Sequence, residues 1–307
     1  MGCRIAVFVG AAAVALAAGA AAQDSPSRAP DGHPDVQGVW YFGSATPLER
    51  PRQFSDKPVL TAEEAAAFER QEAERIGRTA TVHPPDWLDY GTDVVPDRRS
   101  SLIVDPPDGR VPPLTPEGRQ RATERSARRR AAGADGPEAL SVGERCLVFS
   151  AGPPIIPGPY NNNLQIVQTP DAVVLHTEMI HDARIVPLDG RPQLAESARF
   201  WTGSARGRWE GDTLVVETTH FTNQTSFRGS DETLRVIERF TLEGPDALRY
   251  EFTIDNPAVF TAPWTARQTL TRTTDRMYEF ACHEGNYGLL NILKAARYAD
   301  AQALSSR

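Results

Sequence analysis

The second half of the chain alternates apolar and polar residues with a period of two, and this pattern constrains the fold more than any other feature. Residues 247–254 show it most clearly, because every second residue is apolar: Leu248, Tyr250, Phe252 and Ile254. Successive side chains of a β-strand point to opposite faces, so such a segment has one apolar and one polar face. That combination is typical of an antiparallel sheet that covers a core on one side.

Eight segments separated by turn residues read as strands in this way. Many short strands with short links favour an up-and-down barrel or a two-sheet sandwich, and an eight-stranded barrel has room for one small ligand. The predicted fold class is therefore mainly β, an antiparallel barrel or sandwich. The predicted strands are residues 164–168, 172–178, 183–187, 212–220, 233–241, 247–254, 264–272 and 277–282.

The first 22 residues predict an export signal. Arg4 precedes a long apolar run, and alanines end that run just before Gln23. A basic start, an apolar stretch and a small-residue cleavage site are the three parts of a signal peptide. A retained membrane anchor is the alternative. We expect an exported protein, periplasmic or secreted, that is not inserted in a membrane after cleavage.

Residues 23–140 are predicted to form a mostly irregular, partly helical N-terminal extension. Thr61 and Glu64 have the spacing of a capping box, in which each side chain bonds the other's backbone amide at a helix start. Thr115 precedes a proline and predicts the start of a second helix. Residues 79–115 are rich in proline, which cannot donate to a helix or sheet, so we expect an irregular wrapping segment there.

The barrel is then assigned to residues 141–288 and a C-terminal helix to residues 289–307, where it is expected to cover one end or flank of the barrel. The formal net charge is −7, and loss of Arg4 with the signal makes it −8. This acidic balance argues against nucleic acid as a partner. The basic stretch 119–130 is interpreted as a solvated helix face.

Two cysteines, Cys146 and Cys282, remain once Cys3 leaves with the signal. In an oxidising compartment such a pair can form a disulfide. Two buried free thiols are the alternative, because sequence does not show whether the two Cα atoms lie close enough.

The densest group of titratable residues lies between positions 176 and 184. We predict His181 as a general base, oriented by Glu178 or Asp182, with Arg184 stabilising negative charge that develops in the reaction. In a straight strand His176 would share a face with Glu178, Asp182 and Arg184, and His181 would join them only through an irregularity near residues 179–180. A salt-bridge network that joins two strands is the alternative.

The complementary acid is predicted to be Glu284 or Glu238. Glu238 has the same parity as the apolar residues of its strand, so it faces the core. A carboxylate there must be paired or must take up a proton. A tuned acid and a buried ion pair with an arginine are the two interpretations.

Amides and rings near two strand ends are predicted to orient a substrate. Three consecutive asparagines follow a stiff proline-rich segment, and a second polar group follows Cys282. The alternative for both segments is a turn whose polar side chains form hydrogen bonds within the turn itself. The predicted substrate-binding residues are Tyr160, Asn161, Asn162, Asn163, His283 and Asn286.

A metal site is a second possibility for the histidines. His176, Glu178, His181 and His283 together offer enough ligands. Their spacing matches no firm zinc pattern, so the prediction is that the protein needs no metal or other cofactor.

Several longer strings carry a resemblance to a known family. They are 30–32 (PDG), 38–40 (GVW), 105–110 (DPPDGR), 157–163 (PGPYNNN), 181–192 (HDARIVPLDGRP), 206–218 (RGRWEGDTLVVET) and 282–286 (CHEGN). With these strings the chain resembles a widespread, largely uncharacterised family of exported bacterial proteins. The resemblance implies export but no particular reaction. The hairpin at 206–218 is also similar to hairpins of lipocalin-like (calycin) barrels.

These observations favour an exported enzyme that performs acid–base chemistry on a small organic molecule: elimination, hydration, isomerisation or hydrolysis without a covalent nucleophile. The alternative is a noncatalytic periplasmic binding protein for a hydrophobic small ligand. That alternative predicts that the polar groups above are paired with one another and face no cavity. A third interpretation is an envelope-assembly partner that docks through the proline-rich segment.

Overall fold

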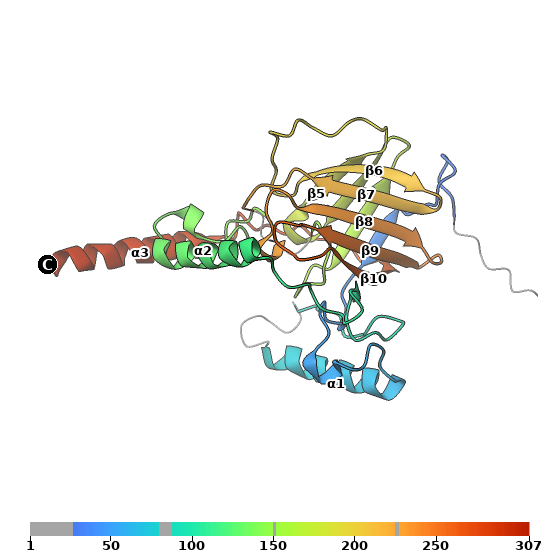
Figure 1. Cartoon of the computed structure of the whole chain (residues 1–307), viewed down its shortest axis with the longest axis horizontal. Coiled ribbons are helices and arrows are strands. Elements are labelled where there is room, and N and C mark those ends of the chain that lie inside the picture. Colours follow the sequence, from blue (N-terminus) through green and yellow to red (C-terminus); the bar gives the residue numbers. More distant parts are fainter. Residues whose placement is uncertain (1–26, 80–87, 150–151, 225–226, 307) are drawn as a thin grey trace, which may run out of the picture.

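A computed structural model describes residues 27–79, 88–149, 152–224 and 227–306. The predicted signal peptide lies outside these ranges. Within them, one ten-stranded antiparallel sheet forms the body of the molecule, and three α-helices lie outside it (Figure 1). The strands are β1 Gly38–Tyr41, β2 Ile103–Asp105, β3 Asn163–Gln168, β4 Ala172–Thr177, β5 Ala183–Pro187, β6 Ser204–Glu210, β7 Thr213–Thr219, β8 Arg235–Leu242, β9 Ala247–Asp255 and β10 Trp264–Thr273.

The sheet has the order β5-β4-β3-β1-β10-β9-β8-β7-β6, with β2 pairing on β10 beside this path. Every ladder along the path is antiparallel. Strand direction therefore alternates along the nine strands of the path. Because nine is odd, the first strand, β5, and the last strand, β6, run in the same direction. The two end strands contact each other, but no ladder joins them in the described part of the chain. The sheet is therefore curled like a barrel and left open at a seam between β5 and β6.

The inward faces of the strands form one hydrocarbon core. In β9 buried and partly exposed residues alternate along the whole strand, as the sequence predicts. Trp40 of β1 and Trp264 of β10 are fully buried, and Phe252 packs edge-on against Trp264 with ring centroids 5.8 Å apart. Large aromatic side chains thus fill the interior rather than surround an open cavity.

Three elements differ from the sequence prediction. Strand β2 lies within residues 79–115, where the prolines predict an irregular segment, and it pairs with β10. Residues 277–282 are not a strand, because they bond to the turn between β4 and β5 instead of to a neighbouring strand: Tyr278 N donates to Glu178 Oε1 at 2.8 Å. Conversely, β6 is a strand that the period-two analysis did not include. It pairs with β7 along its full length.

The first two helices begin where the sequence predicts. At helix α1 (Ala62–Thr79), Glu64 N donates to Thr61 Oγ1 at 3.2 Å and Thr61 N donates to Glu64 Oε2 at 3.0 Å, which confirms the capping box. At helix α2 (Pro116–Ala132), Thr115 Oγ1 accepts a hydrogen bond from Gly118 N at 2.9 Å. Each cap satisfies amides that the first helical turn leaves free.

The C-terminal helix α3 (Tyr287–Ser305) does not cover the barrel as expected. None of its residues is buried, and Figure 1 shows it projecting away from the sheet. A disulfide between Cys146 and Cys282, with Cα atoms 5.8 Å apart, ties the segment before α3 to the chain ahead of β3. Among the described residues, no helix has the length and apolar character needed to span a bilayer.

Candidate functional site

A charged pair crosses the interior of the open barrel. Arg184 on β5 donates from Nη1 to Glu238 Oε2 at 2.6 Å and from Nη2 to Oε1 at 2.9 Å. Tyr250 on β9 donates its hydroxyl hydrogen to Glu238 Oε1 at 2.7 Å and accepts one from Ile155 N at 2.9 Å. Glu238 has no exposed surface. The bidentate geometry is that of a strong guanidinium–carboxylate pair, so the interpretation of Glu238 as one half of a buried ion pair is the one that the contacts fit.

Burial and charge act together on this network. Burial opposes the charge of Arg184, but the adjacent Glu238 carboxylate outweighs it and raises the pKa of Arg184. Burial and the same carboxylate raise the pKa of Tyr250 well above its usual value. At neutral pH Arg184 is therefore a cation and Tyr250 a neutral phenol, and both oxygens of Glu238 accept hydrogen bonds from them.

A pocket of about 240 Å3 opens at the seam, directly over Arg184. Small residues make the space: Ala183 on β5 and Gly203 and Ala205 at β6 all line it. Ile185 and Phe200 form its apolar wall and are 67% and 44% exposed. Farther along the seam the strands are in close contact, since a Cβ added at Gly207 would lie 2.6 Å from Leu188 Cδ2.

The expected irregularity between β4 and β5 is a tight turn at Met179–His181 in which Ile180 and His181 have φ of 63° and 45°. His181 is exposed, and its Nδ1 lies 2.9 Å from the carbonyl oxygen of Phe280. The His181 ring is therefore held by the chain before α3 and not by Glu178 or Asp182. A carbonyl oxygen only accepts, so this contact is a hydrogen bond when Nδ1 carries a proton.

Glu178 is 3% exposed and both of its oxygens are bonded. Asn163 Nδ2 donates to Oε2 at 2.8 Å, and Tyr278 N donates to Oε1 at the same distance. This carboxylate joins β3 to the segment that replaces the expected last strand. Asp182, the other predicted orienting residue, lies beyond the turn and is half-buried.

The shared face that strand parity predicts for His176 and Arg184 does not exist. Leu175 pairs with Arg184 across the β4–β5 ladder and faces inward, so His176 on β4 faces outward, with its Nδ1 3.5 Å from Gln165 Oε1. The turn at residues 179–181 reverses the chain, which makes a straight-strand count invalid. In the described residues no three His, Cys, Asp or Glu side chains lie close enough to hold a metal ion, so His176, Glu178, His181 and His283 do not form the alternative metal site.

The asparagine segment at 161–163 joins loops. Asn162 is buried; its Oδ1 accepts from Gly158 N at 2.8 Å and its Nδ2 donates to Gly158 O at 2.9 Å and also to the carbonyl oxygen of Asp89. Asn161 adopts a left-handed backbone with φ of 56°. Tyr160 stacks on Phe280 with ring centroids 6.1 Å apart. These contacts fit the turn interpretation.

The polar group after Cys282 starts α3. Asn286 caps the helix by accepting from Leu289 N at 3.1 Å and donates from Nδ2 to Glu144 O at 2.8 Å. His283 and Glu284 are exposed, whereas Glu238 is enclosed by the sheet. The two predicted acids thus lie in opposite environments.

Sequence reasoning missed the pocket residues of β6 and the role of Tyr250. The sequence does contain a pattern that indicates the pocket. Every second residue here is small, so one face of the strand carries only small side chains: Gly203, Ala205 and Gly207. A strand face made of small residues marks a place where something else approaches closely.

A second pocket, of about 210 Å3, lies between α1 and the segment after β1. Arg75 and Tyr90 line it, with the Arg75 guanidinium 5.5 Å from the Tyr90 ring centroid. None of the residues predicted for catalysis or binding contributes to it.

No protein-family model, curated protein or solved structure matches this chain.

Proposed function

We propose that the protein binds a small, largely apolar organic molecule in the seam pocket and does not transform it. The observation that carries the proposal is the pairing of the interior charges with one another beneath a pocket that has an apolar wall. Arg184 and Glu238 satisfy each other, and Ile185 and Phe200 expose apolar surface at the opening. Covering such surface is favourable in proportion to the apolar area removed from water.

The rim of the pocket supplies the polar contacts that orient a ligand. Thr202 and Ser204 bring hydroxyl groups, and Arg206 lies at the edge with Nη2 bonded to Pro192 O at 3.0 Å. A mostly apolar wall with a few placed polar groups is the usual composition of a small-molecule site. The volume of about 240 Å3 suits a compact ligand of one or two rings.

The binding test uses dansylamide, a fluorescent two-ring probe with an apolar body and one polar sulfonamide group. We expect saturable fluorescence with the wild type and at least tenfold weaker binding with Ile185→Ser. Val167→Ser is the matched control, because Val167 is 40% exposed on β3 and does not line the pocket. Equal affinity of Ile185→Ser and wild type would contradict the proposal.

The same protein samples distinguish binding from catalysis. A mixture of small metabolites incubated with wild type should return unchanged. Turnover by wild type that is lost in His181→Ala would instead support the acid–base enzyme predicted from sequence.

We further propose that the protein is exported. The disulfide between Cys146 and Cys282 supports this, because such bonds persist in oxidising compartments. The first 22 residues have the parts of a signal peptide. Expression of the full chain should yield an extracytoplasmic product that begins at Gln23, and a product retaining Arg4 would contradict this.

A further inference from the structure

Helices α2 and α3 project together from one side of the barrel, and we name them the helical arm (Figure 1). Helix α3 carries an apolar stripe: Leu289, Ile292, Leu293 and Ala296 have the i, i+3, i+4, i+7 spacing of one helix face. No residue of α3 is buried, and Leu290 and Ile292 on or beside the stripe are 49% and 40% exposed. An amphipathic helix usually covers its apolar face with protein, and in the described chain this one is not fully covered.

The arm is basic although the chain is acidic. Helix α2 has six arginines against two glutamates, a net charge of +4, and α3 has a net charge of +1 from Lys294, Arg297 and Asp300. The whole chain carries −7, so the rest of it carries −12. The positive charge is thus concentrated on the part of the molecule that also exposes apolar side chains.

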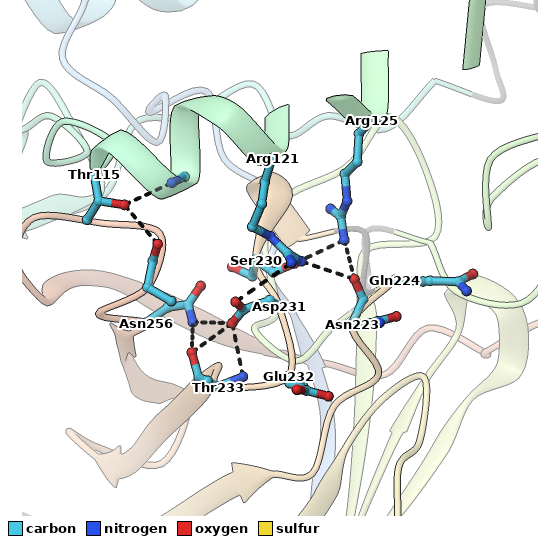
Figure 2. Close-up of polar contacts among 12 residues, drawn as sticks. Thr115, Arg121, Arg125, Asn223, Gln224, Ser230, Asp231, Glu232, Thr233 and Asn256 are labelled. Carbon is cyan, nitrogen blue, oxygen red and sulfur yellow. Dashed lines mark hydrogen bonds and ion pairs between the residues drawn. The ribbon is translucent and has the colours of Figure 1, made fainter. Parts of the chain in front are cut away.

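The first half of α2 is fixed to the end of the barrel, as Figure 2 shows. Arg125 Nη2 donates to Ser230 O at 3.2 Å, and Arg121 Nη2 donates to Asn223 O at 3.2 Å. Arg121 also lies 4.0 Å from the Asp231 carboxylate. These two arginines face the barrel, and their contacts hold the helix against it.

The second half of α2 extends beyond these contacts with the barrel. Arg128, Arg129 and Arg130 are exposed, and the Arg128 side chain retains 80% of its accessible surface. Three consecutive arginines on a helix cover more than half of its circumference, because each residue turns about 100° from the last. They therefore present positive charge on more than one side of the arm.

Helix α3 is held beside this basic end. Arg297 Nη1 donates to Asp135 O at 2.8 Å, just beyond the end of α2, and the disulfide fixes the chain before α3. These contacts link the segment after α2 to α3.

We propose that the helical arm docks on an anionic lipid surface, with α3 lying in the plane of the interface. Exposed apolar side chains together with Lys and Arg are the composition of interfacial helices, and basic clusters are drawn to anionic headgroups. Helix α3 is not apolar enough to cross a bilayer. It lies on the membrane and does not insert across it.

The surface area that α3 offers favours lipid over a second copy of the chain as its partner. A helix rises about 1.5 Å per residue, so the 19 residues of α3 span about 28 Å. One face about 10 Å wide then offers about 280 Å2, well below the roughly 800 Å2 per partner of a stable protein interface. The repulsion between two basic arms acts in the same direction.

Vesicle flotation with the purified chain from Gln23 onward tests this inference. We expect binding to vesicles of 70% phosphatidylcholine and 30% phosphatidylglycerol, no binding to pure phosphatidylcholine, and loss of binding when salt rises from 0.1 to 0.5 M. Arg128→Gln/Arg129→Gln/Arg130→Gln should weaken binding at least tenfold. Leu290→Gln/Ile292→Gln should do the same without a change of charge.

Matched controls carry the same changes outside the helical arm. Arg191→Gln/Arg208→Gln/Arg249→Gln removes three exposed positive charges, and Val59→Gln/Val167→Gln removes two exposed apolar side chains. Both should bind like wild type, and thermal melts check that every variant is folded. Absence of wild-type binding, or equal loss in the controls, overturns the inference. A concentration-dependent dimer that Leu290→Gln/Ile292→Gln abolishes also overturns it, because a second copy would then cover α3.

Discussion

The barrel and the helical arm are stabilised in different ways. In the barrel, side chains from strands far apart in the sequence share one interior, and Trp40, Tyr250 and Trp264 have essentially no exposed surface. In the arm, α3 buries no residue and depends on a disulfide, a cap and a few hydrogen bonds. The barrel therefore gains stability from burial, whereas α3 is tethered by a few contacts and leaves its surface exposed.

The largest effect is expected for Glu238→Ala in the barrel. The change leaves the Arg184 guanidinium buried without its counter-charge, which costs about 3–5 kcal/mol of unfolding free energy. Urea denaturation measures this. The matched control is Glu210→Ala, which removes the surface partner of Arg239 and Arg208 and should shift the midpoint little, because exposed pairs contribute little. Equal effects would mean that the interior charge pair is not shielded from water.

The disulfide comes next, because it links the two regions. The bridge spans 136 residues that contain β3 to β10, so it restricts the unfolded barrel as well as holding the arm. Cys146→Ser/Cys282→Ser should lose about 2–4 kcal/mol in urea denaturation. Wild type under a strong reductant should give the same curve. No loss of stability would show that the arm unfolds separately from the barrel.

A smaller effect is expected at the joint between the regions. Thr115 caps α2 and also donates to Ala258 O at 2.8 Å, and Thr115→Ala should cost about 1 kcal/mol. Thr123→Ala on the same helix is the control, because its hydroxyl only bonds back to Arg119 O. Thermal denaturation of both variants measures the difference. A loss in Thr123→Ala as large as that in Thr115→Ala would show that the cap and the bond to Ala258 do not account for the effect.

The smallest effect is confined to acid pH. Burial opposes ionisation of Asp231, but hydrogen bonds from Asn256 and Thr233 outweigh it and lower the pKa of this carboxyl. A lowered folded-state pKa adds stability that is present above the unfolded pKa of about 3.9 and is lost as pH falls through the folded value. Melting temperatures of wild type should therefore fall more steeply below about pH 4 than those of Asp231→Asn. Glu232→Gln, at the exposed neighbour, should keep the wild-type profile.

Local patterns in the sequence were enough to predict several elements. Strand β9 follows from its period-two alternation, and the starts of α1 and α2 follow from Thr61 with Glu64 and from Thr115. Each of these signals depends on residues within a few positions of one another. The mainly antiparallel β class follows from the same kind of evidence.

Features that depend on long-range pairing could not be predicted with the same certainty. The parity of Glu238 showed that it faces the core, but its contact with Arg184 requires the curl of the sheet, since β5 and β8 are not neighbours in the strand order. Strand parity places His176 and Arg184 on one face only in a straight strand, and the left-handed residues at 180 and 181 break the alternation between them. Residues 277–282 have a strand-like pattern, but they bond to the turn between β4 and β5 instead of to a strand edge. The roles predicted for His181 and Glu284 stay predictions.

The open seam between β5 and β6 has a consequence for aggregation of the protein at high concentration. Among the residues that the structure describes, each end strand has one row of backbone amides and carbonyls without a ladder partner. Exposed rows of this kind can pair with other chains and cause aggregation. Here the two rows face each other across the seam, and side chains such as Leu188 lie close to the backbone at Gly207. The two edges of the open sheet thus shield each other from other chains. A bulky residue at Gly207 would separate them and promote aggregation.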